Sequence, residues 1–428
     1  MFAQSRLVEE WSARHPRAAD LYRRALKVFP SGVTHDIRYM EPYPIYVTHA
    51  QGSRKWDVDG HEYVDYFMGH GALLLGHNHP AVTAAVAEQL QKGTHYGACH
   101  ELEIRWGELV QETVPSAEKV HFFSSGTEAT LMAMRLARAY TGREKVIKIQ
   151  GHFHGWHDYA TIAMTPPYDE PISRGIPTAT ASTIVHVPPM DIQAMRAAFD
   201  RHPDAAGVIL IAGGCGHDYL QGVNDLAHER GAVTIYDEVV TGFRYAPGGC
   251  QEYYGVKPDL TTLAKILAGG FPGGAVAGKA DILDILEFRS DAEWLRFGRI
   301  PHPGTFNANP LSAAAGVACL EIVRTGEPQK QATAQADKLK AGLNETLRRR
   351  GVDGQAGGDV SQVGIRLKAP KVEGRKLTYL FRMAMQLGGV DVSGLSMLVS
   401  AVHTDADVDR TVEAFDAALR MLRADGVI

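Results

Sequence analysis

The sequence is poor in cysteine and has no long apolar run, and these absences exclude several classes of protein. Its 428 residues include four cysteines that lie far apart without CxxC spacing, so neither a disulfide framework nor a zinc ribbon is expected. No apolar run reaches the ~18 residues that span a bilayer, and the first six residues contain no signal-peptide core. The sequence therefore predicts a cytoplasmic protein with free thiols. The cysteines are Cys99, Cys215, Cys250 and Cys319.

Blocks of positive charge and repeated segments are also absent. The formal net charge is −5 and no basic block interrupts the chain, so the sequence gives no sign of a nucleic acid or membrane partner. No internal repeat or low-complexity segment is visible. A hydrophobic content of 45% with 22% charged residues is typical of a compact globular protein, and the length predicts two or three domains.

The order of apolar segments predicts an α/β protein. Short strands are expected between residues 45 and 66, with a turn at Asp59-Gly60. Helical and strand patterns alternate from about 120 to 280, which favours a mostly parallel sheet with helices on both faces. We therefore expect an N-terminal segment with a small meander (1–68), a large domain (69–315) and a C-terminal α+β domain (316–428).

Two apolar segments of the large domain each end on a charged side chain. The run 232–236 leads into Asp237, and the run 260–264 leads into Lys265. Ligands of open α/β sheets bind at the carboxyl ends of the strands. A lysine held there in apolar surroundings has the lowered pKa of a nucleophilic amine, and a nearby acid suits a pyridinium nitrogen. An ordinary structural ion pair is the alternative.

A third candidate is the turn Ser125-Gly126-Thr127, which follows the strand 121–123 and precedes a helix. Free backbone N–H groups and the helix dipole make such a turn a cradle for an anion. The same pattern also describes an ordinary helix start capped by Ser125 or Thr127.

Two further motifs point to nucleotides and metals, and neither is complete. The segment Gly273–Lys279 has the spacing GxxxxGK, but a P-loop requires Ser or Thr where Ala280 stands, and the segment is apolar enough for a strand. The second motif resembles the metallo-hydrolase spacing HxHxDH, but Trp156 replaces the required Asp. Such a cluster more often lines a polar pocket, so no metal is predicted. Its members are His152, His154, His157 and Asp158.

One cofactor would use all three complete features. A phosphate would bind at Ser125-Gly126-Thr127, a protonated pyridine nitrogen at Asp237, and an aldehyde at Lys265. Pyridoxal 5′-phosphate (PLP) carries these three groups. Its flat ring has two apolar faces, which Phe153 and Val239 are placed to cover.

At this point the chain resembles the class III aminotransferases, closest to the branch of glutamate-1-semialdehyde aminomutase and D-phenylglycine aminotransferase. The order and spacing of the shared motifs match from about residue 30 to 425, which is nearly the whole chain. The motifs are Ser125-Gly126-Thr127-Glu128-Ala129, Gly151-His152-Phe153-His154-Gly155, the segment Asp237 to Arg244, Thr262-Leu263-Ala264-Lys265, and the segment Gly304 to Pro310.

The resemblance implies PLP fold type I, with a mostly parallel seven-stranded sheet in the large domain, and a homodimer with shared active sites. It makes Lys265 the lysine that forms the Schiff base and Asp237 the partner of the pyridinium nitrogen. It also implies roles for seven other residues. These are Ser125, Gly126 and Thr127 at the phosphate, Thr305 at the phosphate of the other subunit, Phe153 on the ring, Arg38 on the substrate carboxylate and His70 in the pocket wall.

The chain departs from the family pattern before the Asp237 strand. Most members have Glu-Pro where this chain has Ile211-Ala212, and the following segment looks about seven residues shorter than in relatives, a change that such loops tolerate. The C-terminal arginine that this Glu neutralises in dual-substrate members is also missing from the segment 394–400. Use of glutamate and 2-oxoglutarate as the second pair is therefore open, although Arg38 could accept a carboxylate unaided.

The predicted function is that of a transaminase. It would move the amino group of a small amino acid, aromatic or β-amino, to a 2-oxo acid. The alternative is an isomerase of the aminomutase or epimerase type, which converts one substrate without an acceptor. A third class, a protein that keeps the fold without the chemistry, is opposed by the presence of Lys265 and Asp237.

Overall fold

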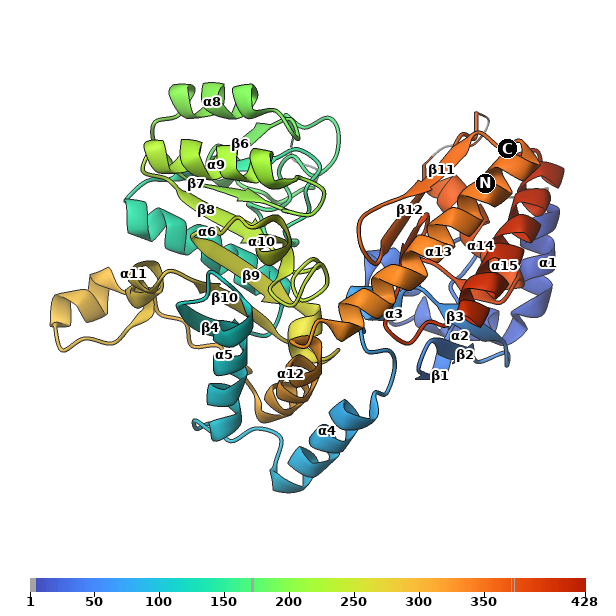
Figure 1. The fold of residues 1–428 in the computed structure, drawn as a ribbon, viewed down its shortest axis with the longest axis horizontal. Helices are drawn as coiled ribbons and strands as arrows, with labels where there is room; N and C mark the ends of the chain where they lie inside the picture. Colours follow the sequence, from blue (N-terminus) through green and yellow to red (C-terminus); the bar gives the residue numbers. More distant parts are fainter. Residues whose placement is uncertain (1–4, 171–172, 371, 373) are drawn as a thin grey trace. The chain divides into compact units, whose positions relative to one another are not determined.

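The computed structural model describes residues 5–170, 173–370, 372 and 374–428. It divides into two compact units, Met1–His79 with Glu327–Ile428, and Pro80–Gly326 (Figure 1). The N-terminal meander and the C-terminal part, which the sequence analysis treats separately, thus share one unit. The reason is a strand pairing, because β13 (Val390–Asp391) adds in parallel to β3 (Glu62–Asp65).

The second unit contains a sheet with seven strands among the described residues, in the order β4-β10-β9-β8-β7-β5-β6. Among the described strands of this sheet, β10 alone runs in the opposite direction to the others. The predicted α/β class and mostly parallel seven-stranded sheet are therefore confirmed. The strands are β4 (Lys119–Phe123), β5 (Lys145–Ile149), β6 (Ile184–Val187), β7 (Ala205–Leu210), β8 (Val233–Asp237), β9 (Leu260–Ala264) and β10 (Gly274–Gly278).

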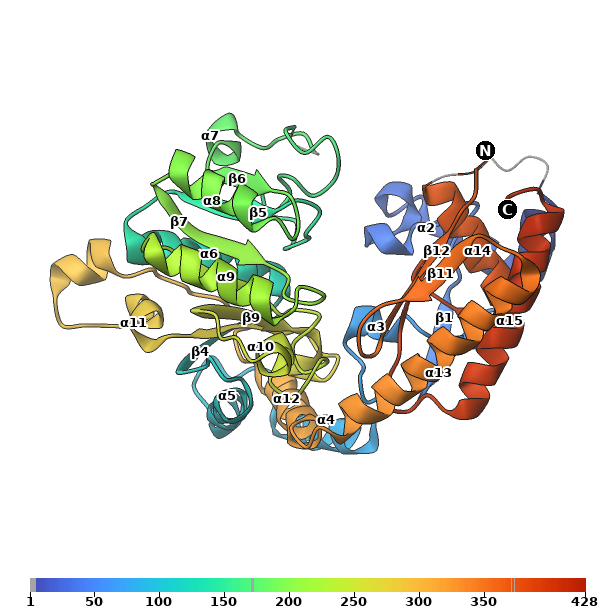
Figure 2. The same ribbon diagram turned by 45° about the horizontal axis from the view of Figure 1, so that its top comes forward.

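Helices cover both faces of this sheet. Figure 2 shows α8 (Ile192–Arg201) and α9 (His217–Glu229) in front of the strands and α6 (Gly126–Thr141) behind them. All residues of β7, β8, β9 and β10 are consequently buried, which explains their continuous apolar sequence. The other helices of this unit are α4 (Pro80–Lys92), α5 (Glu101–Thr113), α7 (Thr178–Ala181), α10 (Gly249–Tyr254), α11 (Ala280–Leu283) and α12 (Pro310–Val323).

The first unit combines two small sheets with helices from both ends of the chain. Trp11 of α1 is fully buried in its core, and its Nε1 donates a hydrogen bond to Gln386 Oε1 of α14 at 2.8 Å. The strands are β1 (Val47–Gln51), β2 (Arg54–Asp57), β3 and β13 in one sheet, and β11 (Gly354–Gly357), β12 (Gln362–Leu367) and β14 (Ser396–Leu398) in the other. The helices are α1 (Arg6–Arg14), α2 (Pro16–Ala25), α3 (Met68–Gly71), α13 (Glu327–Arg350), α14 (Arg375–Leu387) and α15 (Asp405–Ala424).

Several element boundaries differ from the sequence prediction. The sequence pattern predicts a helix near 224–230, whereas α9 already starts at His217, because its buried face extends forward to Leu220. The pattern also predicts one long helical region from Pro310 to about Arg350. In the structure this region is two helices, broken at Gly326, whose positive φ of 77° interrupts the helix. Gly274–Gly278 forms a strand, as its apolar sequence favours over a P-loop. No helix of the described ranges is long and apolar enough to cross a membrane.

A buried cluster of charges joins the N-terminal and C-terminal parts of the first unit. Lys55 Nζ lies 2.8 Å from Asp65 Oδ1 and 2.6 Å from Asp391 Oδ2, and Arg382 makes a bidentate pair with Asp391 at 2.8 and 3.0 Å. Burial alone would raise the pKa of Asp391, but the adjacent Arg382 and Lys55 lower it to about 2. The two acids are therefore ionised at neutral pH.

Replacement of Lys55 by Met is expected to lower the free energy of unfolding of this unit by about 3–5 kcal/mol at pH 7, because two buried carboxylates lose a common partner. Urea unfolding followed by circular dichroism measures the loss. Since the pKa of Asp391 is depressed, the difference from the wild type should shrink as the pH falls from about 4 towards 2. Lys27→Met removes an exposed lysine of the same unit and serves as control; equal losses in both variants would contradict the prediction.

Candidate active site

The structure brings the two charged strand ends next to each other. β8 and β9 are neighbours in the sheet, and Asp237 stands opposite Thr262 in their register. Lys265 follows Thr262 by three positions, at the start of the turn Lys265–Ala268. Both residues thus lie at the carboxyl edge of the sheet, where the sequence analysis expects a ligand.

Three groups hold the Asp237 carboxylate in place. Its side chain is 4% exposed, and Oδ1 accepts hydrogen bonds from the Val239 amide at 3.0 Å and Thr262 Oγ1 at 3.2 Å. Oδ2 lies 2.6 Å from His154 Nδ1. Within the described ranges, no ion pair joins Asp237 to Lys265. The carboxylate is therefore fixed in place without neutralisation by the lysine.

Lys265 has the environment of a nucleophilic amine. Burial lowers the pKa of its amino group, and the nearby Asp237 carboxylate opposes this effect only in part. Its φ of 55° lies in the left-handed region, which costs a non-glycine residue on the order of 1 kcal/mol and tends to occur at functional sites. The chain leaves the sheet in this strained turn immediately after β9.

The start of α6 lies against the ends of the same two strands. A Cβ on Gly126 would come within 2.9 Å of Val239 and 3.3 Å of Ala264, so only glycine fits this close approach. Ser125 is the N-cap and its hydroxyl accepts a hydrogen bond from the Glu128 amide at 3.3 Å. Ser125 therefore caps the helix, as the alternative interpretation of this turn expects. The amides of Gly126 and Thr127 belong to the first turn of α6, where N–H groups have no partner within the helix and can bind an anion.

The loop after β5 covers this helix start. Gly155 has a φ of 105°, and a Cβ there would lie 2.7 Å from Thr127 Oγ1. The loop presents Phe153, whose side chain is 55% exposed, and buries the next residue, His154. This arrangement is expected if the exposed ring of Phe153 covers a bound cofactor ring while the buried His154 contacts the Asp237 carboxylate.

These residues fit PLP. The helix start offers unpaired N–H groups to a phosphate, Asp237 offers a buried anion to a pyridinium nitrogen, and Lys265 offers an amine of lowered pKa to an aldehyde. The three features converge because α6 packs on β8 and β9. The roles of the individual residues remain predictions.

The histidines of the incomplete metal motif make hydrogen bonds within the protein. Nδ1 of His152 accepts from the Ile211 amide at 3.0 Å, and Nε2 of His157 lies 3.3 Å from Thr130 Oγ1. Burial lowers the pKa of both imidazoles to about 4, so they are neutral at pH 7. His152 thus supports the loop at 211–216, where the family's Glu-Pro is missing.

The sequence analysis missed His154 as the partner of Asp237. The two residues are 83 positions apart, and no spacing rule links a loop residue after one strand to the end of another. The only local signal is the motif Gly151-His152-Phe153-His154-Gly155 itself, in which the buried histidine follows the exposed aromatic ring.

His154→Ala is expected to lower the free energy of unfolding by about 1–3 kcal/mol, because a buried oxygen of Asp237 loses its donor. His154→Asn keeps an N–H donor and should recover part of the loss. Urea unfolding of the wild type and both variants at pH 7.5 measures the difference. Equal stability of the Ala variant and the wild type would show that the contact contributes nothing.

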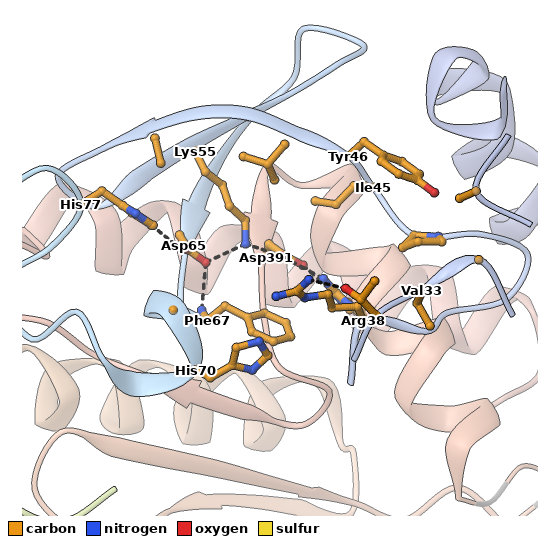
Figure 3. Close-up of a pocket in the computed structure, with 18 of the residues that line it drawn as sticks. Val33, Arg38, Ile45, Tyr46, Lys55, Asp65, Phe67, His70, His77 and Asp391 are labelled. Atoms are coloured by element: carbon orange, nitrogen blue, oxygen red, sulfur yellow. Dashed lines mark hydrogen bonds and ion pairs between the residues drawn. The ribbon is translucent and has the colours of Figure 1, made fainter. Parts of the chain in front are cut away.

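The two predicted substrate residues belong to the first unit. Arg38 ends the short turn Asp36–Arg38, and its Nη1 donates to Thr34 Oγ1 at 3.0 Å. His70 stacks on His35 with ring centroids 4.6 Å apart. Both line one pocket of this unit (Figure 3). In the second unit, Thr305 is exposed and its carbonyl accepts a hydrogen bond from His95.

Known proteins resemble this chain over almost its full length. The family model for class III aminotransferases matches residues 37–419. The glutamate-1-semialdehyde 2,1-aminomutase of Methanopyrus kandleri is 36% identical over 95% of this chain and 98% of its own. The crystal structure of an omega-transaminase from Sphaerobacter thermophilus is 33% identical, with a TM-score of 0.89 over 96% of this chain and 99% of the other.

A solved transaminase with PLP bound also shares the fold. It is 27% identical, with a TM-score of 0.89, and the alignment covers 96% of this chain and 99% of that one. The expected family and cofactor are thereby confirmed. On the family match, the fold and the donor set at the ends of β8 and β9, this chain belongs to the class III aminotransferases, whose cofactor is pyridoxal 5′-phosphate.

Proposed function

We propose that this protein moves the amino group of an amino acid that carries a carboxylate, with Lys265 as the amine that holds the cofactor. The observation that carries the proposal is the partly buried Lys265, of lowered pKa, beside the hydrogen-bonded Asp237 at adjoining strand ends. If the two residues were a structural ion pair, the Lys265 amine would contact the Asp237 carboxylate. Among the described residues, no such ion pair joins them.

Bound PLP withdraws electrons from the substrate carbon that bears the amino group. Asp237 would favour a protonated ring nitrogen, because its carboxylate is fixed in place by three donors. The amine of Lys265, whose pKa burial lowers, would accept a proton from that carbon.

The remaining predicted residues would bind and orient. Gly126 and Thr127 would hold the phosphate with their amides and Ser125 with its hydroxyl, while Phe153 and Val239 would cover the two faces of the ring. Arg38 would hold the substrate carboxylate, with His70 in the pocket wall. Thr305 would reach the phosphate in a neighbouring subunit, which requires the predicted homodimer.

An isomerase of the aminomutase type is the first candidate for the reaction, in place of the transaminase predicted from the sequence. The support is the 36% identical relative, named glutamate-1-semialdehyde 2,1-aminomutase, that covers nearly the whole chain. Such an enzyme returns the amino group to the carbon skeleton of the same substrate. A transaminase is the second candidate, supported by the 33% identical omega-transaminase structure.

Single-substrate incubation separates the two reactions. Enzyme in its pyridoxamine phosphate form is mixed with glutamate-1-semialdehyde alone, and PLP enzyme with one amino acid at a time. An isomerase gives many turnovers to an isomer without an added acceptor. A transaminase stops after one equivalent of oxo product per active site and continues only when a 2-oxo acid is supplied. If no amine or semialdehyde is converted in either form, the proposed function is wrong.

The predictions of a homodimer and of a cytoplasmic location belong to the same proposal. The homodimer rests on the family resemblance and on the role that it gives to Thr305. Analytical ultracentrifugation of the loaded enzyme tests it, and a monomer at micromolar concentration would exclude the shared active site. Fractionation of cells tests the location.

A further inference from the structure

Two histidines, an aspartate and a tyrosine of the first unit lie together, away from the residues discussed above. His15 lies between α1 and α2, Asp57 ends β2, His61 precedes β3 and Tyr63 belongs to β3. Among the residues that the structure describes, His15, Asp57 and His61 are the one group of three possible metal ligands whose donor atoms all lie within 4.8 Å of one another. The incomplete metal motif at 152–158 belongs to the second unit, so this is a different cluster.

The contacts of His15 leave one of its ring nitrogens without a hydrogen. His15 is 1% exposed, and its Nδ1 lies 2.6 Å from the carbonyl oxygen of Trp11. Because a carbonyl only accepts, Nδ1 carries the hydrogen and donates it. Burial lowers the pKa of the imidazole, although the bond to Trp11 opposes this effect, so the ring is neutral at pH 7 and Nε2 presents a lone pair. Metal-binding histidines are held in the same way, by an N–H of the second ring nitrogen.

The cluster has one hydrogen too few for its acceptors. Tyr63 Oη lies 2.8 Å from His15 Nε2 and 2.7 Å from Asp57 Oδ2, but a phenol has a single hydrogen to donate. Asp57 is a carboxylate here, because hydrogen bonds from Tyr63 and His61 outweigh its burial and lower its pKa. The His15 lone pair and the Asp57 carboxylate therefore compete for one hydrogen, and one of them lacks a positive partner.

The spacing of the three donor atoms suits a tetrahedral cation. His15 Nε2 lies 3.5 Å and His61 Nδ1 lies 3.0 Å from Asp57 Oδ2. Two ligands of a tetrahedral Zn²⁺, with bonds of about 2.0–2.1 Å, stand roughly 3.3 Å apart. The other oxygen of Asp57 accepts hydrogen bonds from the amides of Asp59 and His61 at 2.9 and 2.8 Å, which keeps Oδ2 turned towards the two imidazoles.

A pocket of about 300 Å³ gives access to this cluster. His15, His61 and Tyr63 line it together with Arg410, and the side chain of His61 is 34% exposed. An ion can therefore reach the two imidazoles from solvent, and a water molecule can complete its coordination. Two imidazoles, one carboxylate and a water form a common ligand set of Zn²⁺, whereas Ca²⁺ and Mg²⁺ prefer oxygen ligands.

We propose that His15, Asp57 and His61 bind a zinc ion, with water as its fourth ligand. The ion gives the lone pair of His15 and the carboxylate of Asp57 a common positive partner, while Tyr63 keeps its hydrogen bond to Asp57. It also joins the junction of α1 and α2 to the turn between β2 and β3. The zinc site stabilises the first unit and does not depend on the reaction proposed above.

Equilibrium dialysis of tag-free, PLP-loaded protein against ZnCl₂, followed by metal analysis, tests the site. We expect one Zn²⁺ per chain with a Kd of about 10 µM or tighter. His61→Ala removes the most exposed ligand, so that folding should tolerate the change, and should weaken binding by about tenfold or more. His49→Ala removes an exposed histidine of the same unit that is not in the cluster, and should bind zinc as the wild type does.

Two further measurements test the site without comparing affinities. Zinc should raise the Tm of the wild type and of His49→Ala but not that of His61→Ala, because a ligand that binds only the folded state stabilises it. An anomalous difference map from a crystal soaked in ZnCl₂ should place the ion between His15, Asp57 and His61. A Kd weaker than about 10 µM, equal affinity in the wild type and His61→Ala, or zinc bound only elsewhere would overturn the inference.

Discussion

Lys265→Ala is expected to lose both the visible absorbance of the lysine-bound cofactor and all measurable turnover. The variant removes the amine that would bond covalently to the PLP aldehyde, and its loss should reduce kcat by roughly 10⁴-fold or more. PLP should still bind non-covalently, because Asp237 and the start of α6 are unchanged.

The measurement is an absorption spectrum of dialysed protein, followed by borohydride reduction and mass spectrometry. Wild-type protein should retain the mass of one reduced cofactor on the peptide that carries Lys265. Lys257→Ala, which removes an exposed lysine a few residues before β9, should behave as the wild type. Covalent cofactor in the Lys265→Ala variant would mean that another lysine is the nucleophile, and the assignment of the whole site would fall.

Asp237→Asn should lower kcat by about 10²- to 10³-fold, the scale of losing one preorganised charge contact, ~2.7–4 kcal/mol. The change keeps the size of the side chain and removes the negative charge that favours a protonated ring nitrogen. Cofactor loading should persist, because Lys265 and the helix start remain. Stopped-flow absorbance with a reactive amine separates the chemical step from substrate binding.

The control for this variant is Asp225→Asn, which changes an exposed acid on α9. It should leave kcat unchanged. An Asp237→Asn enzyme with kcat within twofold of the wild type would show that the carboxylate does not act on the ring nitrogen, and its bonds to Val239, Thr262 and His154 would then have only a structural role.

The loop between β7 and α9 separates this chain from the family pattern. Ile211 and Ala212 stand where most members have Glu-Pro, and α9 begins at His217 directly after Gly216. The Ile211 amide donates to His152, whose neighbour His154 contacts Asp237. The altered loop is thus connected to the candidate site through two neighbouring histidines, which sequence comparison with the family would not indicate.

Local patterns in the sequence were sufficient for most of the second unit. Strand β9 has the predicted limits, because a strand buried on both faces requires a nearly continuous apolar run that can be recognised from adjacent residues. The turn before α6 and the charged residues at the ends of β8 and β9 were predicted for the same reason. The cap, the glycine and the terminal charge all lie within a few residues of the element that they limit.

Short sequence patterns did not predict the structure at the chain ends or the contacts between distant segments. The sequence did not predict α1, nor that β13 pairs with β3 across more than 300 positions, so the first and last segments appeared to be separate. Nor did it predict the order in which strands pair, which makes β8 and β9 neighbours and seats β10 antiparallel between β9 and β4. Pairing depends on the packing of whole elements, which no short window contains.

By itself, then, the sequence determined the fold class, the cofactor and the residue types at the site, since each depends on short-range periodicity or on a motif. Only the tertiary structure decided that Asp237 is anchored by His154 from a loop 83 residues away, and that Lys265 is not its ion-pair partner in the described chain. Both findings depend on which polar groups contact each other, and such contacts follow from proximity in space, which the order of residues along the chain does not reveal.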